Sequence, residues 1–149
     1  MAEFIGRVES AARVLLADVG VRILTIDAPD HDEIRADILG SDAVHERFQM
    51  TAEPPVDEEA AATGMGAWHI NNVNEFETVL EGDGIVEFWT EDGAVAVLLT
   101  SGDIMAVERA EHRYCPLTPQ LWSLRFAGGP DAEFVGTDTG RPSLEWPSA

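Results

Sequence analysis

Lysine does not occur in this sequence of 149 residues, and all nine basic residues are arginines. Without lysine, no side-chain amine is available to form a Schiff base with a carbonyl substrate. The 28 acidic residues outnumber the basic ones and give a formal net charge of -19. Such a chain repels phosphate backbones and anionic membrane surfaces, so we expect neither nucleic acid nor a membrane as a partner.

Cysteine occurs only once, as Cys115, so the chain cannot form an internal disulfide. We expect this thiol to be buried and inert. Long apolar runs are also missing, since the longest, AVAVLL at 94–99, is too short to cross a bilayer. The first ten residues lack the basic start and apolar centre of a signal peptide. These absences predict a cytoplasmic protein.

The composition is otherwise that of a globular protein, with 45% hydrophobic and 25% charged residues, and the length suits one domain over 1–149. Residues 1–64 should supply an N-terminal region with a helix over Glu3–Gly20, a strand, a short helix that Asp30 caps, and an acidic loop. Residues 65–127 should form the core of the domain. The turn-rich residues 128–149 should wrap the outside as a tail.

Short strands separated by turns are predicted from Met65 onward. The turn sequences EGDG, EDG and SGD punctuate this region, and EDG between two apolar runs indicates a hairpin. The pattern favours a mainly β sandwich or small barrel whose interior holds one small ligand. The predicted strands are GAWHIN, FETVLEG, GIVEFWT, AVAVLLT, DIMAVE, EHRYCP and LWSLRFA.

Four polar residues in this strand region have spacing that suits a metal site. His69 and Asn71 are alternate residues of one strand and so point to the same face. A bend before Glu75 could return its carboxylate to the same point, and His112 would come from a separate strand. Two imidazoles and one carboxylate are the set typical of non-haem iron(II) sites. Asn71 adds a neutral amide, which could ligate weakly or hold a water or the substrate.

These residues give the chain a resemblance to acireductone dioxygenases of the cupin superfamily. The resemblance runs from about Val21 to Pro142 and includes FETVLEGDG, SGDIMAVERAEHRY and LRFAGGPDAEFVGTDTGRP. It implies a cupin jelly-roll barrel with N-terminal helices. It also implies metal ligands at His69, Glu75 and His112, with Asn71 in place of a fourth, histidine ligand.

The chain departs from this family at two positions near the substrate. Asn74 stands where the family has an acid proposed as the catalytic base, and Glu77 stands where it has an arginine. An amide cannot act as a base near neutral pH, and Glu77 reverses a charge that should meet an anionic enediol. Arg125 matches a second family arginine when a one-residue gap is allowed. The resemblance therefore implies an inherited scaffold and metal site but a different substrate chemistry.

We accordingly predict a metal-dependent oxygenase, dioxygenase-like, that acts on a small oxygenated metabolite, for instance in a biosynthetic pathway. Fe2+ is the expected metal, with Ni2+, Mn2+ and Zn2+ as alternatives. Arg125 should anchor a negative substrate group, and Tyr114 should face the pocket because it follows His112 by two residues. A redox-neutral lyase or isomerase, and a non-catalytic metabolite-binding cupin, are the alternatives. Family resemblance also implies a homodimer.

Overall fold

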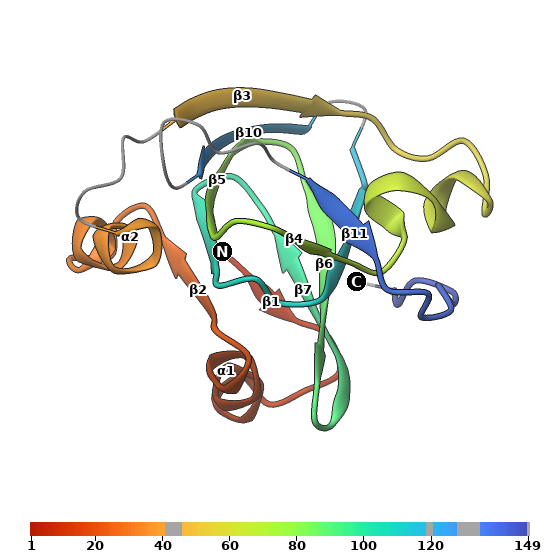
Figure 1. Cartoon of the computed structure of the whole chain (residues 1–149), viewed down its shortest axis with the longest axis horizontal. Helices are drawn as coiled ribbons and strands as arrows, with labels where there is room; N and C mark the ends of the chain where they lie inside the picture. Colours follow the sequence, from red (N-terminus) through yellow and green to blue (C-terminus); the bar gives the residue numbers. More distant parts are fainter. Residues whose placement is uncertain (41–45, 119–120, 128–134, 149) are drawn as a thin grey trace.

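Two antiparallel sheets form the body of the protein (Figure 1). The computed structural model describes residues 1–40, 46–118, 121–127 and 135–148, and in β3 and β10 it describes the backbone alone. The first sheet has the order β1 (Glu3–Phe4), β7 (Gly93–Leu99), β6 (Gly84–Thr90), β9 (His112–Pro116), β4 (His69–Asn71) and β11 (Gly136–Asp138). The second has the order β2 (Val21–Thr25), β8 (Asp103–Val107), β5 (Glu75–Glu81), β10 (Leu121–Ala127) and β3 (Glu46–Ala52).

The main core lies between the sheets because alternate residues of each strand point inward. From β6, Val86 and Phe88 are fully buried, and from β8, Met105 and Val107 are almost so. These residues join one apolar cluster that also includes side chains of β2, β5, β7 and β9. The alternation that predicted the strands therefore also determines which residues fill the interior.

Helices cover one end and one outer face of the two sheets. Helix α1 (Glu9–Asp18) buries Ala12 and Leu16 in the main core. Helix α2 (His31–Leu39) packs Ile38 and Leu39 on the outer face of the second sheet, against Phe76 of β5. Two short 3-10 turns, η1 (Ala60–Ala62) and η2 (Gly64–Gly66), follow β3. No helix among the described residues is long and apolar enough to cross a membrane.

The N-terminal helix is shorter than predicted. The apolar spacing suggested a helix from Glu3, but Phe4 lies in β1 and pairs with Val97. Gly6 follows with a φ of 68°, a left-handed conformation that suits glycine, and the helix starts at Glu9. Asp30 precedes α2 as predicted, but its side chain makes no capping hydrogen bond.

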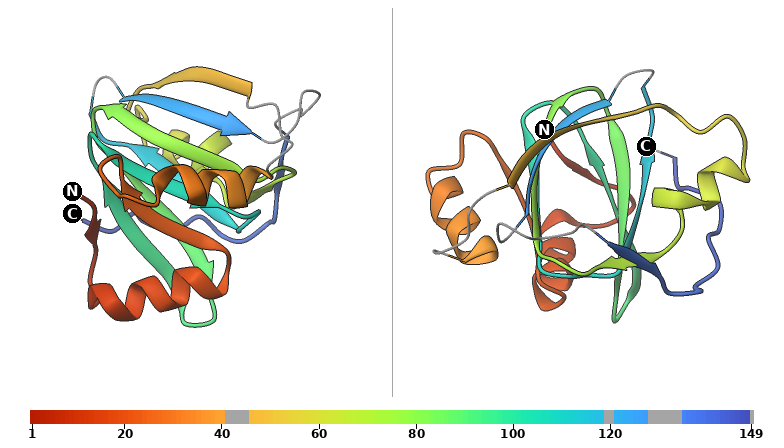
Figure 2. Two further views of the ribbon diagram at one scale, coloured as in Figure 1. Left: turned by 90° about the vertical axis from the view of Figure 1, so that its left-hand side faces the viewer. Right: turned by 45° about the horizontal axis from the view of Figure 1, so that its top comes forward.

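The predicted strands after residue 65 are confirmed, including the hairpin at EDG. Thr90 pairs with Gly93 across this turn, and Gly93 has a φ of 85°. Two further strands, β3 and β11, were not predicted. Strand β11 pairs with β4, and the C-terminal tail then runs on the side of the sheets away from α2 (Figure 2).

Candidate metal centre in the sheet interior

His69 and His112 are brought together by neighbouring strands. They are the paired residues of β4 and β9, and their ring centroids lie 4.5 Å apart. His112 is buried, and Phe88 of β6 packs beside its ring at 5.7 Å between centroids. The sequence prediction that a separate strand delivers His112 to His69 is therefore confirmed.

Both imidazole rings are held by the same kind of hydrogen bond. Nδ1 of His69 lies 2.7 Å from the carbonyl oxygen of Ala67, and Nδ1 of His112 lies 2.8 Å from that of Ala110. A carbonyl oxygen can only accept, so each Nδ1 carries a proton and donates it. In the neutral rings the lone pair is then on Nε2. Backbone anchoring of this kind orients histidines that ligate metals.

Glu75 reaches His112 from the second sheet. The chain bends at 72–74 between β4 and β5, as the motif required, and brings the carboxyl group back toward Asn71. Glu75 is fully buried, and its Oε1 lies 3.4 Å from Nε2 of His112. Two donors that are each about 2.1 Å from one ion at the tetrahedral angle lie about 3.4 Å apart. This pair of atoms therefore has the spacing of two ligands to one metal.

The amide of Asn71 lies beside both of these groups. Its Nδ2 donates to Oε1 of Glu75 at 3.2 Å and lies 3.5 Å from Nε2 of His112. An amide nitrogen can donate but not accept, which agrees with a lone pair on His112 Nε2. Asn71 is itself buried. In this structure it therefore meets the other two residues through its nitrogen and not through its oxygen.

The residues fit a metal in their chemistry, although they do not surround one in this arrangement. Within the described part of the chain, no group of three or more His, Cys, Asp or Glu side chains has the geometry to hold an ion. Two Nε2 lone pairs and a buried carboxyl group are nevertheless a suitable donor set for a divalent transition metal. The amide nitrogen of Asn71 forms the third corner of a nearly equilateral triangle with Oε1 of Glu75 and Nε2 of His112, where a third ligand atom would be needed.

Strand β11 closes over the same cluster. Gly136 is paired with Asn71, and a Cβ added to it would lie 3.2 Å from Oδ1 of Asn71 and 3.4 Å from Cδ2 of His69. Such distances are tight for a side chain. The C-terminal strand thus approaches the site closely because glycine stands at this position.

Tyr114 and Arg125 are the other predicted site residues. Tyr114 shares the inner face with His112, but its ring lies over Gly84, where a Cβ would meet the hydroxyl at 2.6 Å. It also lines a pocket of about 330 Å³ between β9 and η2, together with Cys115. Arg125 lies directly opposite the buried Glu77 in the β5–β10 register, and its side chain is outside the described part.

Asn74 is turned away from the cluster. Its Nδ2 donates to the carbonyl oxygen of Ile38 in α2 at 2.9 Å. Asn74, which stands at the position of the family's proposed base, therefore links the bend at 72–74 to helix α2.

Arg113 follows His112, so strand alternation directs it to the outer face, and it is buried there. Its Nε donates to Glu87 at 2.6 Å, and its Nη1 donates to Ser143 and to the carbonyl oxygen of Leu144, both at 2.7 Å. The guanidinium carbon lies 3.9 Å from the ring centroid of Trp146. The C-terminal tail is therefore bound to the residue that follows His112 in β9. Alternation gives the direction of Arg113, but only a contact distant in sequence buries it.

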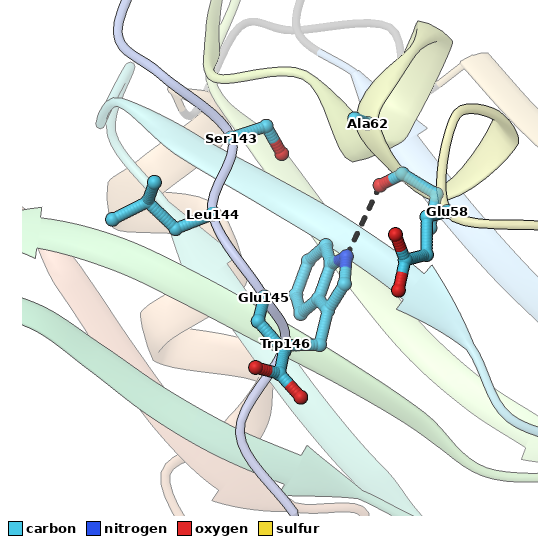
Figure 3. A pocket seen from close by; sticks show the side chains of 7 residues that line it. Glu58, Ala62, Ser143, Leu144, Glu145 and Trp146 are labelled. Carbon is cyan, nitrogen blue, oxygen red and sulfur yellow. Dashed lines mark hydrogen bonds between the residues drawn. The ribbon is translucent and has the colours of Figure 1, made fainter.

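A pocket of about 330 Å³ lies beside these contacts between Arg113 and the C-terminal tail (Figure 3). The indole of Trp146 borders it, and its Nε1 donates to the carbonyl oxygen of Ala61 at 3.1 Å. Glu58 and Glu145 extend beside the indole at the rim. The pocket lies between the tail and η1, and none of the four predicted metal ligands lines it.

Glu111 and Cys115 have shifted pKa values. Hydrogen bonds from Arg141 lower the pKa of Glu111, and Arg141 also stacks over Trp89 at 3.6 Å. Burial raises the pKa of the Cys115 thiol. The prediction that Cys115 is a buried thiol is confirmed, and the raised pKa keeps it in the unreactive protonated form.

Two stacked antiparallel sheets with a polar cluster at their interior define the class of fold as a cupin jelly roll. The structure is similar to an acireductone dioxygenase from Bacillus anthracis with a cadmium ion in its active centre, with a TM-score of 0.58 and 17% identity over 87% of this chain and 93% of that chain. It is more distantly similar to an oxalate decarboxylase from Bacillus subtilis, with a TM-score of 0.46 and 13% identity over 80% of this chain and 27% of that chain.

No family model and no curated protein matches the sequence. The structural likeness confirms the predicted fold and its resemblance to acireductone dioxygenase.

Proposed function

We propose that the protein is a metal-dependent cupin enzyme that acts on a small oxygenated metabolite. One observation carries this proposal: backbone carbonyls hold Nδ1 of both His69 and His112, the two rings lie 4.5 Å apart, and Nε2 of His112 lies 3.4 Å from the buried carboxyl group of Glu75. Building two such anchored imidazoles beside Glu75 in an apolar interior is costly unless the set binds something. A divalent cation satisfies all three groups at once.

His69, Glu75 and His112 would hold the ion, and Fe2+ is the first candidate because two imidazoles and a carboxylate leave positions open for substrate and dioxygen. When bound, the ion would polarise substrate oxygens and lower their pKa. Around it, Phe88 excludes water from the His112 side. Arg125 would anchor a negative substrate group, and Tyr114 would form part of the wall beyond His112.

The reaction differs from that of acireductone dioxygenase. Asn74 donates its amide to Ile38 and has no proton-accepting group to offer near neutral pH. Glu77 is buried on β5, where an arginine would be needed for an anionic enediol. We therefore assign an oxygenase function with another oxygenated metabolite as the substrate.

A redox-neutral lyase or isomerase, or a metabolite-binding protein without a metal, is the alternative. The observation that favours a weak metal or none is the Asn71 amide, which already bridges Glu75 and His112. Oxygen consumption separates the oxygenase from a redox-neutral enzyme, and metal content separates both from a binding protein.

Elemental analysis of protein purified without chelator tests the proposal. We expect about one transition metal per chain, and we expect His112→Ala to lose most of it while its circular dichroism spectrum is retained. His31→Ala is the matched control, because His31 lies on α2 against Phe76, on the outer face of the second sheet. Metal binding by His112→Ala as tight as in the parent would refute the ligand assignment.

A further inference from the structure

The Asn71 amide completes a continuous chain of hydrogen bonds. Ala110 accepts from Nδ1 of His112, which leaves the lone pair on Nε2. Nδ2 of Asn71 carries two hydrogens, and it faces that lone pair at 3.5 Å and Oε1 of Glu75 at 3.2 Å. Each neighbour of the amide nitrogen is therefore an acceptor, and each is also a metal donor.

From this arrangement we infer that the Asn71 amide nitrogen stands in for the cation in the metal-free protein, and that a metal must displace it. This inference rests on the proposed function, because it concerns the same site. The NH2 group of Asn71 places partial positive charge next to both the carboxyl group and the imidazole, as a cation would. When the ion enters, the amide must exchange nitrogen for oxygen, since only Oδ1 can face a cation.

The surroundings of Asn71 allow this exchange. Its Oδ1 now faces β11, where Gly136 has no side chain and a Cβ would lie only 3.2 Å away. Turning the amide about its terminal bond swaps two atoms of similar size, so the same space accepts Nδ2. No backbone movement is needed, because terminal amide torsions are broad and roughly two-fold.

The consequence is that Oε1 of Glu75 and Nε2 of His112 both face a hydrogen-bond donor when no metal is bound. A neutral histidine at position 71 could not donate to both Glu75 and His112, so the empty site would contain unsatisfied acceptors. Asparagine satisfies them, and this lowers the free energy of the metal-free form. The free energy of metal binding becomes less favourable by the same amount.

Thermal unfolding of Asn71→Asp, in EDTA and with Zn2+ as the probe, tests this inference without an activity assay. In EDTA the variant places a second carboxyl group against Glu75 and lacks the donor, so we expect its Tm to fall by about 5 °C or more. With Zn2+ the new carboxylate is a ligand and nothing has to be displaced. The Zn2+-induced rise in Tm should therefore exceed that of the parent.

Asn72→Asp is the matched control. Asn72 is exposed, and its Oδ1 accepts from the backbone nitrogen of Val135, a bond that aspartate retains. Its Tm should follow the parent in both conditions. A metal-free Asn71→Asp protein as stable as the parent would overturn the inference. If Zn2+ raises the Tm of the parent and of Asn71→Asp equally, the inference that the Asn71 amide competes with the metal is wrong, but the proposed metal function stands. If Zn2+ raises the Tm of neither protein, both the inference and the proposed metal function are wrong.

NMR of the parent protein provides a measurement that does not depend on a variant folding. The side-chain NH2 signals of Asn71 should exchange slowly with solvent in EDTA, because both hydrogens are buried and bonded. Zn2+ should shift them and speed their exchange. Fast exchange in EDTA, or signals that bound Zn2+ leaves unchanged, would contradict the displacement.

Discussion

His69 and His112 are the single directly paired couple between β4 and β9, two strands that are described in full. The pairing sets the distance between the two rings, which lie 4.5 Å apart. β4 therefore depends for its position on this one pair and on its three-residue pairing with β11. The geometry of the candidate centre thus depends on the short strand β4, which pairs with β9 on one side and β11 on the other.

Replacing Asn71 by histidine should raise metal affinity without producing acireductone dioxygenase activity. Imidazole is a stronger donor than a neutral amide, and the change removes the nitrogen that bridges Glu75 and His112. Asn74 and Glu77 would still leave the family's base absent and its charge reversed. Metal titration and acireductone turnover under oxygen measure the two parts. Robust turnover by the single variant would show that Asn74 and Glu77 matter less than argued.

Arg125→Leu should weaken the binding of small anions while leaving the metal content unchanged. Loss of a charge-assisted hydrogen bond reduces affinity by about tenfold to a hundredfold. The affinity of Arg125→Lys for small anions should lie between those of the parent and Arg125→Leu, because lysine keeps the charge but lacks the planar guanidinium fork. Titration of malonate into metal-loaded protein is the measurement. Unchanged binding, with a lowered Tm that Glu77→Gln restores, would instead assign Arg125 to an ion pair with its register neighbour.

Arg113→Met should destabilise the fold strongly. The substitution leaves Glu87 buried without its cationic partner and detaches Ser143 and Leu144 of the tail. Breaking one side of a buried ion pair costs about 3–5 kcal/mol. Urea unfolding measures the lost free energy of unfolding, and the double variant that also carries Glu87→Gln should recover part of this stability. A loss below about 1 kcal/mol would place this pair among ordinary surface ion pairs.

Glu111→Gln should be less stable than the parent at neutral pH but not in acid. The pKa of Glu111 is lowered from 4.5 in the folded protein by its hydrogen bonds from Arg141. The unfolded state therefore binds more protons in this window, and the stabilisation is complete above pH 4.5 and is lost as pH falls through the folded pKa. The Tm difference between the two proteins should narrow over that range. A constant difference would mean that ionisation of Glu111 contributes nothing.

Alternation and turn residues were sufficient to predict the strands after residue 65, and the motif predicted that His112 comes to His69 from a separate strand. The helix start was missed because the apolar spacing of Phe4 fits a helix equally well, and pairing with Val97 decided in favour of a strand. Such a competition is settled by tertiary contacts and not by the local sequence.

The orientation of the Asn71 amide could not have been predicted in this way. Spacing says which face of a strand a residue occupies, but not which atom of its side chain meets a neighbour. That choice depends on the proton on Nδ1 of His112, which in turn depends on the carbonyl of Ala110. The burial of Arg113 likewise depends on tail residues 30 and 31 positions later in the chain.

The pairing of β11 with β4 also has a consequence for how the protein is made. The backbone nitrogen of Val135 donates a hydrogen bond to Asn72, 63 residues earlier. The ribosome must therefore synthesise most of the chain before β11 can pair with β4. Closing a loop of this length is entropically costly and slow compared with forming the β6–β7 hairpin. The nascent protein can therefore assemble its sheets while the cluster around Asn71 is still open on one side. Docking of Gly136 over His69 and Asn71 then completes the cluster as a late event in folding.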